Sequence, residues 1–267
     1  MGTRHWSGLW HDHRPLVGMV HLPPLPGAPR WEGNFESVVA RAADDARTLA
    51  EAGFDAVIVE NFGDVPFHGH RVPAETVAAM TAAVVSVVRA VDIPVGVNVL
   101  RNDAAAALGV AAATGARFVR VNVHTGSMWT DQGLLEGRAA ETLRLRSALE
   151  LEVAILADVH VKHAVPPAGS DLADAAADTW HRGLADALVV TGTGTGRTSA
   201  SADVTRVRTS VPTAPVLVGS GVDTATVRST LEQADGVIVG SAVMEGGVAG
   251  GRVDPRRASE LVRAAGR

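Results

Sequence analysis

A carboxylate, an imidazole and an amine stand at alternate positions where one apolar segment of the chain ends. The segment 152–157 is typical of a strand buried on both faces of a parallel sheet, and Asp158, His160 and Lys162 follow it. Because side chains alternate along a strand, we expect these three residues on one face. Three ionisable groups at alternate positions indicate acid–base chemistry. The alternative is an ion-paired strand end without a catalytic role.

The composition excludes several classes of function. The chain has 267 residues, of which 46% are hydrophobic, so it can bury a sizeable core. It contains no Cys, which excludes disulfides, thiolate nucleophiles and Cys-based zinc sites. The net charge of -5 arises from intermixed signs without a basic block, so we expect no nucleic-acid partner. The segment 1–15 is polar and the apolar runs are too short for membrane insertion, so we expect a cytoplasmic protein.

Two sets of short apolar runs alternate along the chain and predict eight strands. One set follows helix-stop signals, at 53–61, 115–122, 183–192 and 234–240. The other set, mostly introduced by Pro, lies at 15–21, 94–100, 152–158 and 215–219. Helical segments with start and stop signals are expected at 36–52, 74–90, 103–114, 137–149, 171–182, 202–210, 224–232 and 255–265.

Eight alternating strands and helices predict one parallel (β/α)8 barrel, a TIM barrel. We expect it to span residues 1–267 as a single domain, with residues 1–14 as an N-terminal extension. An open, doubly wound sheet is the alternative architecture.

Polar residues cluster where the predicted strands end, which is where barrel enzymes carry their active sites. The candidate catalytic residues are His21, Glu60, Asn98, Asn122, Asp158, His160 and Lys162. Glu60 and Asp158 would supply a general base and acid. His21 and His160 would orient other groups or carry protons. Lys162 would either form a Schiff base, as in an aldolase-type lyase, or stabilise an oxyanion, as an isomerase requires.

Glycine and serine at the last strand ends predict a phosphate site. Glycines let backbone N–H groups approach an anion, and in barrels the loops after strands seven and eight commonly bind phosphate. The candidate phosphate-binding residues are Gly192, Gly194, Gly219, Ser220, Gly221, Gly240 and Ser241. The segment 191–198 lacks the spacing of a P-loop or of a dinucleotide fingerprint, so a phosphorylated small molecule is the expected ligand. Tight turns without a ligand are the alternative.

Two further expectations concern a metal and the quaternary structure. Glu60, Asp158 and His160 have the mixed oxygen and nitrogen ligands of a divalent metal site, which would make the protein a metal-dependent hydrolase or lyase. No other cofactor is expected. Long loops at 22–31, 62–72 and 124–136 are typical of lids or subunit contacts, and we expect a homo-oligomer.

With these motifs, the chain resembles the BtpA family, also called BtpA/SgcQ, a group similar to phosphate-binding (β/α)8 barrels. The resemblance runs nearly end to end and is carried by GMVHLPPLPG (18–27), VENF (59–62), VNVLRN (97–102) and ADVHVKH (157–163). The family takes its name from photosystem I biogenesis, and other members resemble proteins of sugar metabolism. The resemblance therefore implies either an enzyme acting on a phosphorylated sugar or nucleotide-like metabolite, of lyase or isomerase type, or a non-catalytic assembly factor.

Overall fold

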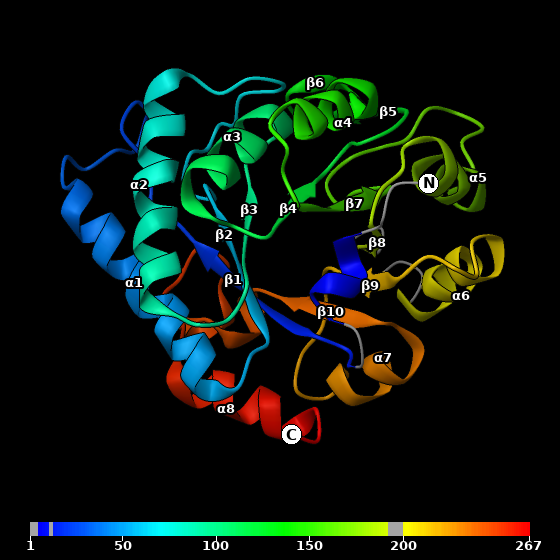
Figure 1. The fold of residues 1–267 in the computed structure, drawn as a ribbon. Helices are drawn as coiled ribbons and strands as arrows, with labels where there is room; N and C mark the ends of the chain where they lie inside the picture. The colour runs from blue at the N-terminus through cyan, green and yellow to red at the C-terminus, as the bar shows by residue number, and fades with distance from the viewer. Residues whose placement is uncertain (1–4, 11–12, 192–199) are drawn as a thin grey trace.

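The strands of the protein close into a parallel barrel, as predicted. The computed structural model describes residues 5–10, 13–191 and 200–267. The barrel strands are β1 (Leu16–His21), β2 (Ala56–Glu60), β3 (Val95–Asn98), β4 (Phe118–Val121), β7 (Ala154–Val159), β8 (Ala187–Val190), β9 (Val216–Val218) and β10 (Gly236–Val239). Each pairs in parallel with its neighbours, and β1 pairs with β10, which closes the ring (Figure 1).

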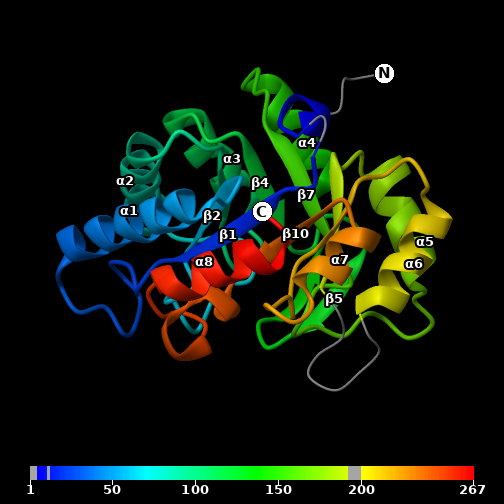
Figure 2. The same ribbon diagram turned by 90° about the horizontal axis from the view of Figure 1, so that it is seen from below.

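Helices cover the outside of the ring, as Figures 1 and 2 show. They are α1 (Phe35–Ala52), α2 (Ala74–Ala90), α3 (Ala104–Thr114), α4 (Ala139–Ala148), α5 (Leu172–Ala177), α6 (Ala200–Ser210), α7 (Val227–Gln233) and α8 (Pro255–Ala264). Local signals fix several of their ends. The side chain of Asn34 accepts a hydrogen bond from the Ser37 amide at the start of α1, and Gly53 ends that helix with a φ of 100°.

Two elements differ from the sequence prediction. The helix expected to run to residue 182 stops at Ala177 and continues as a π-helical turn, Asp178–Arg182. The segment 124–136, expected to be a loop, contains an antiparallel hairpin of β5 (Ser127–Thr130) and β6 (Gly133–Glu136). Its turn lacks the Asn-Gly or Asp-Gly pair that would have marked it in the sequence.

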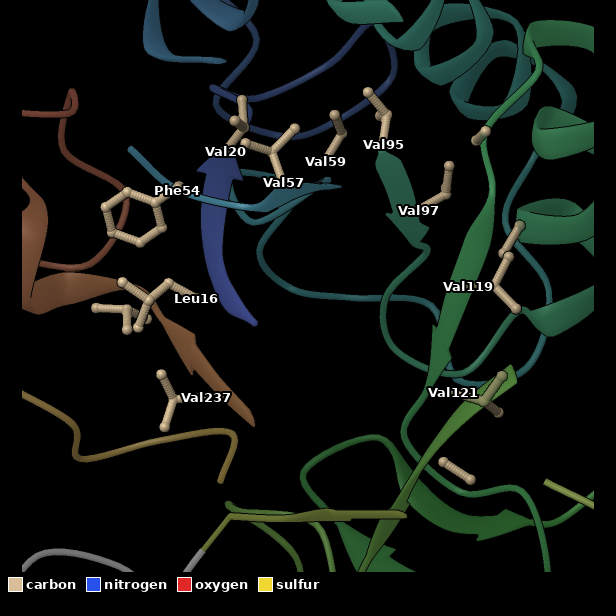
Figure 3. Close-up of a cluster of buried hydrophobic side chains, with 14 of the residues drawn as sticks. Leu16, Val20, Phe54, Val57, Val59, Val95, Val97, Val119, Val121 and Val237 are labelled. Atoms are coloured by element: carbon tan, nitrogen blue, oxygen red, sulfur yellow. The ribbon is translucent and has the colours of Figure 1, made fainter. Parts of the chain in front are cut away.

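The hydrophobic core has two layers because alternate strand residues point to opposite sides of the sheet. Val57, Val59, Val97 and Val119 belong to the outer layer, between strands and helices (Figure 3). The inner layer fills the barrel and includes Met19, Ile58, Phe118, Leu156, Val189, Leu217 and Ile238. Trp10 joins this inner layer, with its ring 5.3 Å from that of Phe118.

This packing leaves the carboxyl end of the barrel for polar groups. Trp10 precedes β1 and packs against the inner layer, so part of the predicted N-terminal extension contributes to the core.

Among the described residues, no helix is both long and apolar enough to span a membrane.

The inner layer has no room for a side chain at Gly96 on β3. A Cβ atom there would lie 2.3 Å from Cε2 of Phe118. Gly96→Ala is expected to lower the free energy of unfolding in urea by about 2 kcal/mol, because the ring must move within a packed core. The matched control is Gly109→Ala in α3, where an added Cβ meets nothing within 4 Å. The free energy of unfolding of that variant should be higher than that of the wild type by about 0.5–1 kcal/mol. Equal effects of the two substitutions on the free energy of unfolding would contradict the packing argument.

Candidate active site

Polar residues and glycines occupy the inward positions at the carboxyl end of the barrel. They follow the inner-layer residues of the same strands at alternate positions, so their side chains point to the same side of the sheet. His21 pairs in register with Glu60, and Glu60 pairs in register with Asn98. The set is His21, Glu60, Asn98, Arg120, Asn122, Asp158, Thr191, Gly219 and Gly240. Five of the seven predicted catalytic residues therefore lie together: His21, Glu60, Asn98, Asn122 and Asp158.

The centre of this group is a buried ion pair between β4 and β7. Nε and Nη2 of Arg120 donate to the two carboxylate oxygens of Asp158 over 3.1 and 3.2 Å. Nδ2 of Asn122 donates to the same carboxylate over 2.8 Å. Burial alone would lower the pKa of Arg120, but the carboxylates of Asp158 and Glu60 raise it above its usual value. The guanidinium therefore stays charged, and its two-point contact fixes the carboxylate in place.

Arg120 was missing from the predicted site, although the sequence carried a signal for it. It is the one charged residue in the otherwise apolar strand β4 (Phe118–Val121). A charge within a buried parallel strand requires a partner, because an unpaired buried charge is very unfavourable.

A second pair, His21 and Glu60, lies beside the first. Nδ1 of His21 accepts the Gly250 amide over 3.0 Å, so in the neutral ring Nε2 carries the proton. Nε2 lies 3.6 Å from Oε1 of Glu60, which is long for a hydrogen bond. The ring stacks on Phe62 with 4.3 Å between centroids.

Burial sets the charge of both groups. It lowers the pKa of His21 to about 3, and the positive charges of Arg120 and Arg41 act in the same direction. It raises the pKa of Glu60 to about 7, against the opposing effect of Arg120 and Arg101. At neutral pH the imidazole is therefore neutral, and the carboxyl exchanges between its two forms.

His160 does not continue the inward row, because the strand alternation expected to place Asp158, His160 and Lys162 on one face ends before it. Strand β7 ends at Val159, and His160 has a φ of 52°, which breaks the alternation. Nε2 of His160 lies 3.0 Å from Oγ of Ser170. The backbone amide of Lys162 donates to Oγ1 of Thr191 over 2.9 Å.

The proposed metal ligands are separated by the same turn. Glu60 and Asp158 face the barrel axis, whereas His160 turns toward Ser170. Among the residues that the structure describes, no group of three or more His, Asp or Glu side chains is placed to hold a metal ion.

A cavity of about 400 Å³ leads outward from the ion pair. Its inner wall includes Asn122 and Asp158. Its outer wall is formed by the β5–β6 hairpin, by α5 and by the loop that holds His160 and Ser170. The cavity therefore extends from the protein surface to the residue Asp158, whose side chain is itself fully buried.

The predicted phosphate-binding turns lie at the same end of the barrel. Gly240 faces inward, and a Cβ added there would lie 3.6 Å from Cε1 of His21. Gly221 has a φ of 73°, and Oγ of Ser220 donates to the carbonyl of Thr191. Ser241 is exposed and begins a 3-10 helix, Ser241–Val243. Two other predicted residues, Gly192 and Gly194, lie outside the described residues.

Sequence comparison agrees with the resemblance noted above. The model of the BtpA family matches residues 12–267. The photosystem I biogenesis protein BtpA of Synechocystis sp. is 46% identical over 255 residues, covering 96% of this chain and 89% of that protein. An uncharacterized protein of Pyrococcus furiosus is 46% identical over 250 residues, covering 94% of each chain.

Among solved structures, the fold is similar to those of several enzymes. N-(5'-phosphoribosyl)anthranilate isomerase from Pyrococcus furiosus has a TM-score of 0.56 and 16% identity, covering 95% of this chain and 99% of that chain. Dihydropteroate synthase from Vibrio fischeri has a TM-score of 0.60 and 13% identity, covering 97% of this chain and 94% of that chain. At such low identity these likenesses show the fold alone.

The buried ion pair gives a prediction for stability. Asp158→Asn should lower the free energy of unfolding by about 3 kcal/mol, because it leaves Arg120 charged and without its carboxylate. The double variant Arg120→Met/Asp158→Asn should recover at least about 1 kcal/mol, since no unpaired charge remains buried. The exposed pair Arg47–Asp44 is the control, and Asp44→Asn should change stability by less than about 0.5 kcal/mol. Strictly additive effects at residues 120 and 158 would contradict this account.

The raised pKa of Glu60 gives a prediction for pH dependence. Its ordinary value of 4.5 rises to about 7 in the folded protein. Between these values the folded state binds more protons, so the contribution of Glu60 to stability is lost as pH rises from about 4.5 to about 7. In chemical denaturation, Glu60→Gln should therefore become more stable relative to wild type over this range, by on the order of 3 kcal/mol.

The control for this measurement is Glu36→Gln, which removes an exposed carboxylate from the first turn of α1. It separates the effect of burial from that of losing one negative charge. If the free energies of unfolding of Glu60→Gln and wild type change in parallel with pH, Glu60 has no raised pKa.

Proposed function

The chain belongs to the BtpA family, and we propose that it is an enzyme that moves a proton within a phosphorylated small metabolite. The observation that carries the proposal is the buried Glu60 carboxyl, whose pKa is raised to about 7 beside a neutral His21. A general base works best when its pKa lies near the working pH. Isomerisation, or cleavage by a lyase, begins with such a proton transfer next to a carbonyl group.

The neighbouring residues suit separate roles in this reaction. Glu60 takes the proton from carbon and later returns it. His21, with its proton on Nε2, is a neutral hydrogen-bond donor that does not compete with Glu60 for the proton. Asp158 accepts three hydrogen bonds, and we assign it the role of holding Arg120 rather than that of a general acid.

Phosphate recognition is assigned to the turns after β9 and β10. Gly240 faces the barrel axis beside His21, where an added Cβ would make an ordinary contact of 3.6 Å with Cε1 of that ring. At Gly219 the position of a side chain is already taken by Val189 and Arg120. In barrels of this type the equivalent loops commonly bind phosphate. The name of one structural neighbour, N-(5'-phosphoribosyl)anthranilate isomerase, also describes a phosphorylated substrate in a similar barrel.

A second candidate function is a non-catalytic assembly factor. It is favoured by the 46% identity to a photosystem I biogenesis protein over most of both chains. Such a factor would bind a partner and convert no metabolite. A proton-transfer assay separates the two candidates.

Solvent exchange tests the enzyme proposal directly. The protein is incubated in D2O with phosphorylated aldoses and ketoses of three to six carbons, and deuterium beside the carbonyl is followed by proton NMR. The wild type should label at least one of them, faster as pH rises through about 7, because Glu60 must be ionised to act as a base. Glu60→Gln should be slower by at least about 10²-fold, whereas Glu36→Gln should match wild type. Failure of the wild type to label any sugar phosphate would favour the assembly factor.

A further inference from the structure

Several buried side-chain atoms in and after the barrel strands have no hydrogen-bond partner among the described residues, including atoms of His70, His124 and Gln132. Two of these unpartnered atoms belong to residues at the end of β3 or just after it. They are Nε of Arg101, a donor, and Oδ1 of Asn98, an acceptor. Buried donors and acceptors in native proteins are nearly always paired, and each unpaired one is costly. A donor and an acceptor left unpaired at a candidate active site indicate that a ligand completes them.

Arg101 carries a charge that the site does not neutralise. It follows β3, its residue is 9% exposed, and Nη2 donates to the carbonyl of Lys162 over 2.8 Å. Asp158, the carboxylate that most favours the charged form of Arg101, already accepts hydrogen bonds from two nitrogen atoms of Arg120. Among the described residues no carboxylate forms an ion pair with Arg101. When Glu60 is protonated, the site therefore has two guanidinium groups and one carboxylate.

Asn98 lies beside the proposed base. It is the last residue of β3 and the register partner of Glu60 on β2. Its Nδ2 donates to the carbonyl of Arg120 over 3.2 Å and to Oδ1 of Asn122 over 3.3 Å. Those two contacts fix the orientation of the amide, so its Oδ1 remains available to accept a proton donor such as a hydroxyl group.

We propose that Arg101 is a catalytic residue and that the substrate is a phosphorylated α-hydroxycarbonyl compound. The carbonyl oxygen accepts from Arg101, and the hydroxyl group on the adjacent carbon donates to Asn98. This assignment rests on the function proposed above, and it specifies which kind of carbon acid the site accepts.

The proposed reaction needs no atoms or electrons beyond those of the substrate and these side chains. Glu60 removes the proton from the carbon that bears the hydroxyl group, and the C–H bonding pair becomes the C=C bond of an enediolate. The carbonyl π pair moves onto oxygen, where the charge of Arg101 stabilises the new oxyanion. Glu60 then returns its proton to the former carbonyl carbon, and the C=C pair forms the new C–H bond. The hydroxyl proton passes to the former carbonyl oxygen, and the O–H bonding pair it leaves becomes the π bond of the new carbonyl group. The isomerisation is then complete without an oxidant or a co-reactant.

Binding of two small probes tests this assignment. Phosphoglycolate carries a phosphate and a planar carboxylate that mimics the enediolate, whereas ethyl phosphate carries a phosphate alone. In titration calorimetry the wild type should bind phosphoglycolate about 10–100-fold more tightly than ethyl phosphate, the gain expected from charge-assisted hydrogen bonds. Arg101→Gln should lose that preference and bind ethyl phosphate as the wild type does.

Two further variants control the measurement. Arg71→Gln removes an exposed guanidinium from the loop after β2 and should keep the wild-type preference. Arg101→Lys retains the charge and should keep part of the preference, and it serves in place of Arg101→Gln if circular dichroism shows that the latter is unfolded. If the folded Arg101 variants keep the full preference for phosphoglycolate over ethyl phosphate, the role proposed for Arg101 is wrong. That result leaves the proposed phosphate site in place. If neither probe binds to the wild type, the proposed phosphate site fails as well.

Discussion

The buried contact between Arg120 and Asp158 is the constraint around which the carboxyl end of the barrel is arranged. Removing both groups from water is costly, and only good geometry offsets that cost. Two hydrogen bonds from the guanidinium and a third from Asn122 provide it. Gly219 makes the arrangement sterically feasible, since a Cβ there would lie 3.2 Å from Nη2 of Arg120 and 2.5 Å from Cγ1 of Val189.

The other ionisable groups of the site are buried beside this contact. Burial raises the pKa of Glu60 toward neutrality, although the charges of Arg120 and Arg101 lower it. The same burial keeps His21 neutral. The barrel thus places a carboxyl group that can exchange protons next to groups whose charges do not change near pH 7.

The fold and the site carry different kinds of information about function. Parallel barrels with similar strand order support many reactions, so likeness to an isomerase at 16% identity and to a synthase at 13% identity concerns architecture. The arrangement of Glu60, His21, Arg120 and Asp158 depends on the particular side chains at the carboxyl ends of the strands, which the fold alone does not determine.

Local sequence signals were sufficient for most of the fold. Helix α2 has the predicted bounds, and helices α1 and α3 begin within one residue of their predicted starts and end as predicted, because capping and side-chain periodicity involve residues only a few positions apart. Strand parity also placed Glu60 and Asp158 at the same end of the barrel, since parallel strands bring their carboxyl ends to one edge.

Only the tertiary structure decided what these residues contact and how they are charged. Arg120 and Asp158 meet across 38 positions of sequence, and the direction of His160 depends on a left-handed backbone conformation at the end of β7. The pKa of Glu60 depends on the water excluded by neighbouring strands. Burial and long-range pairing are properties of the closed ring, whereas the sequence by itself determined the strands and helices from which the ring is built.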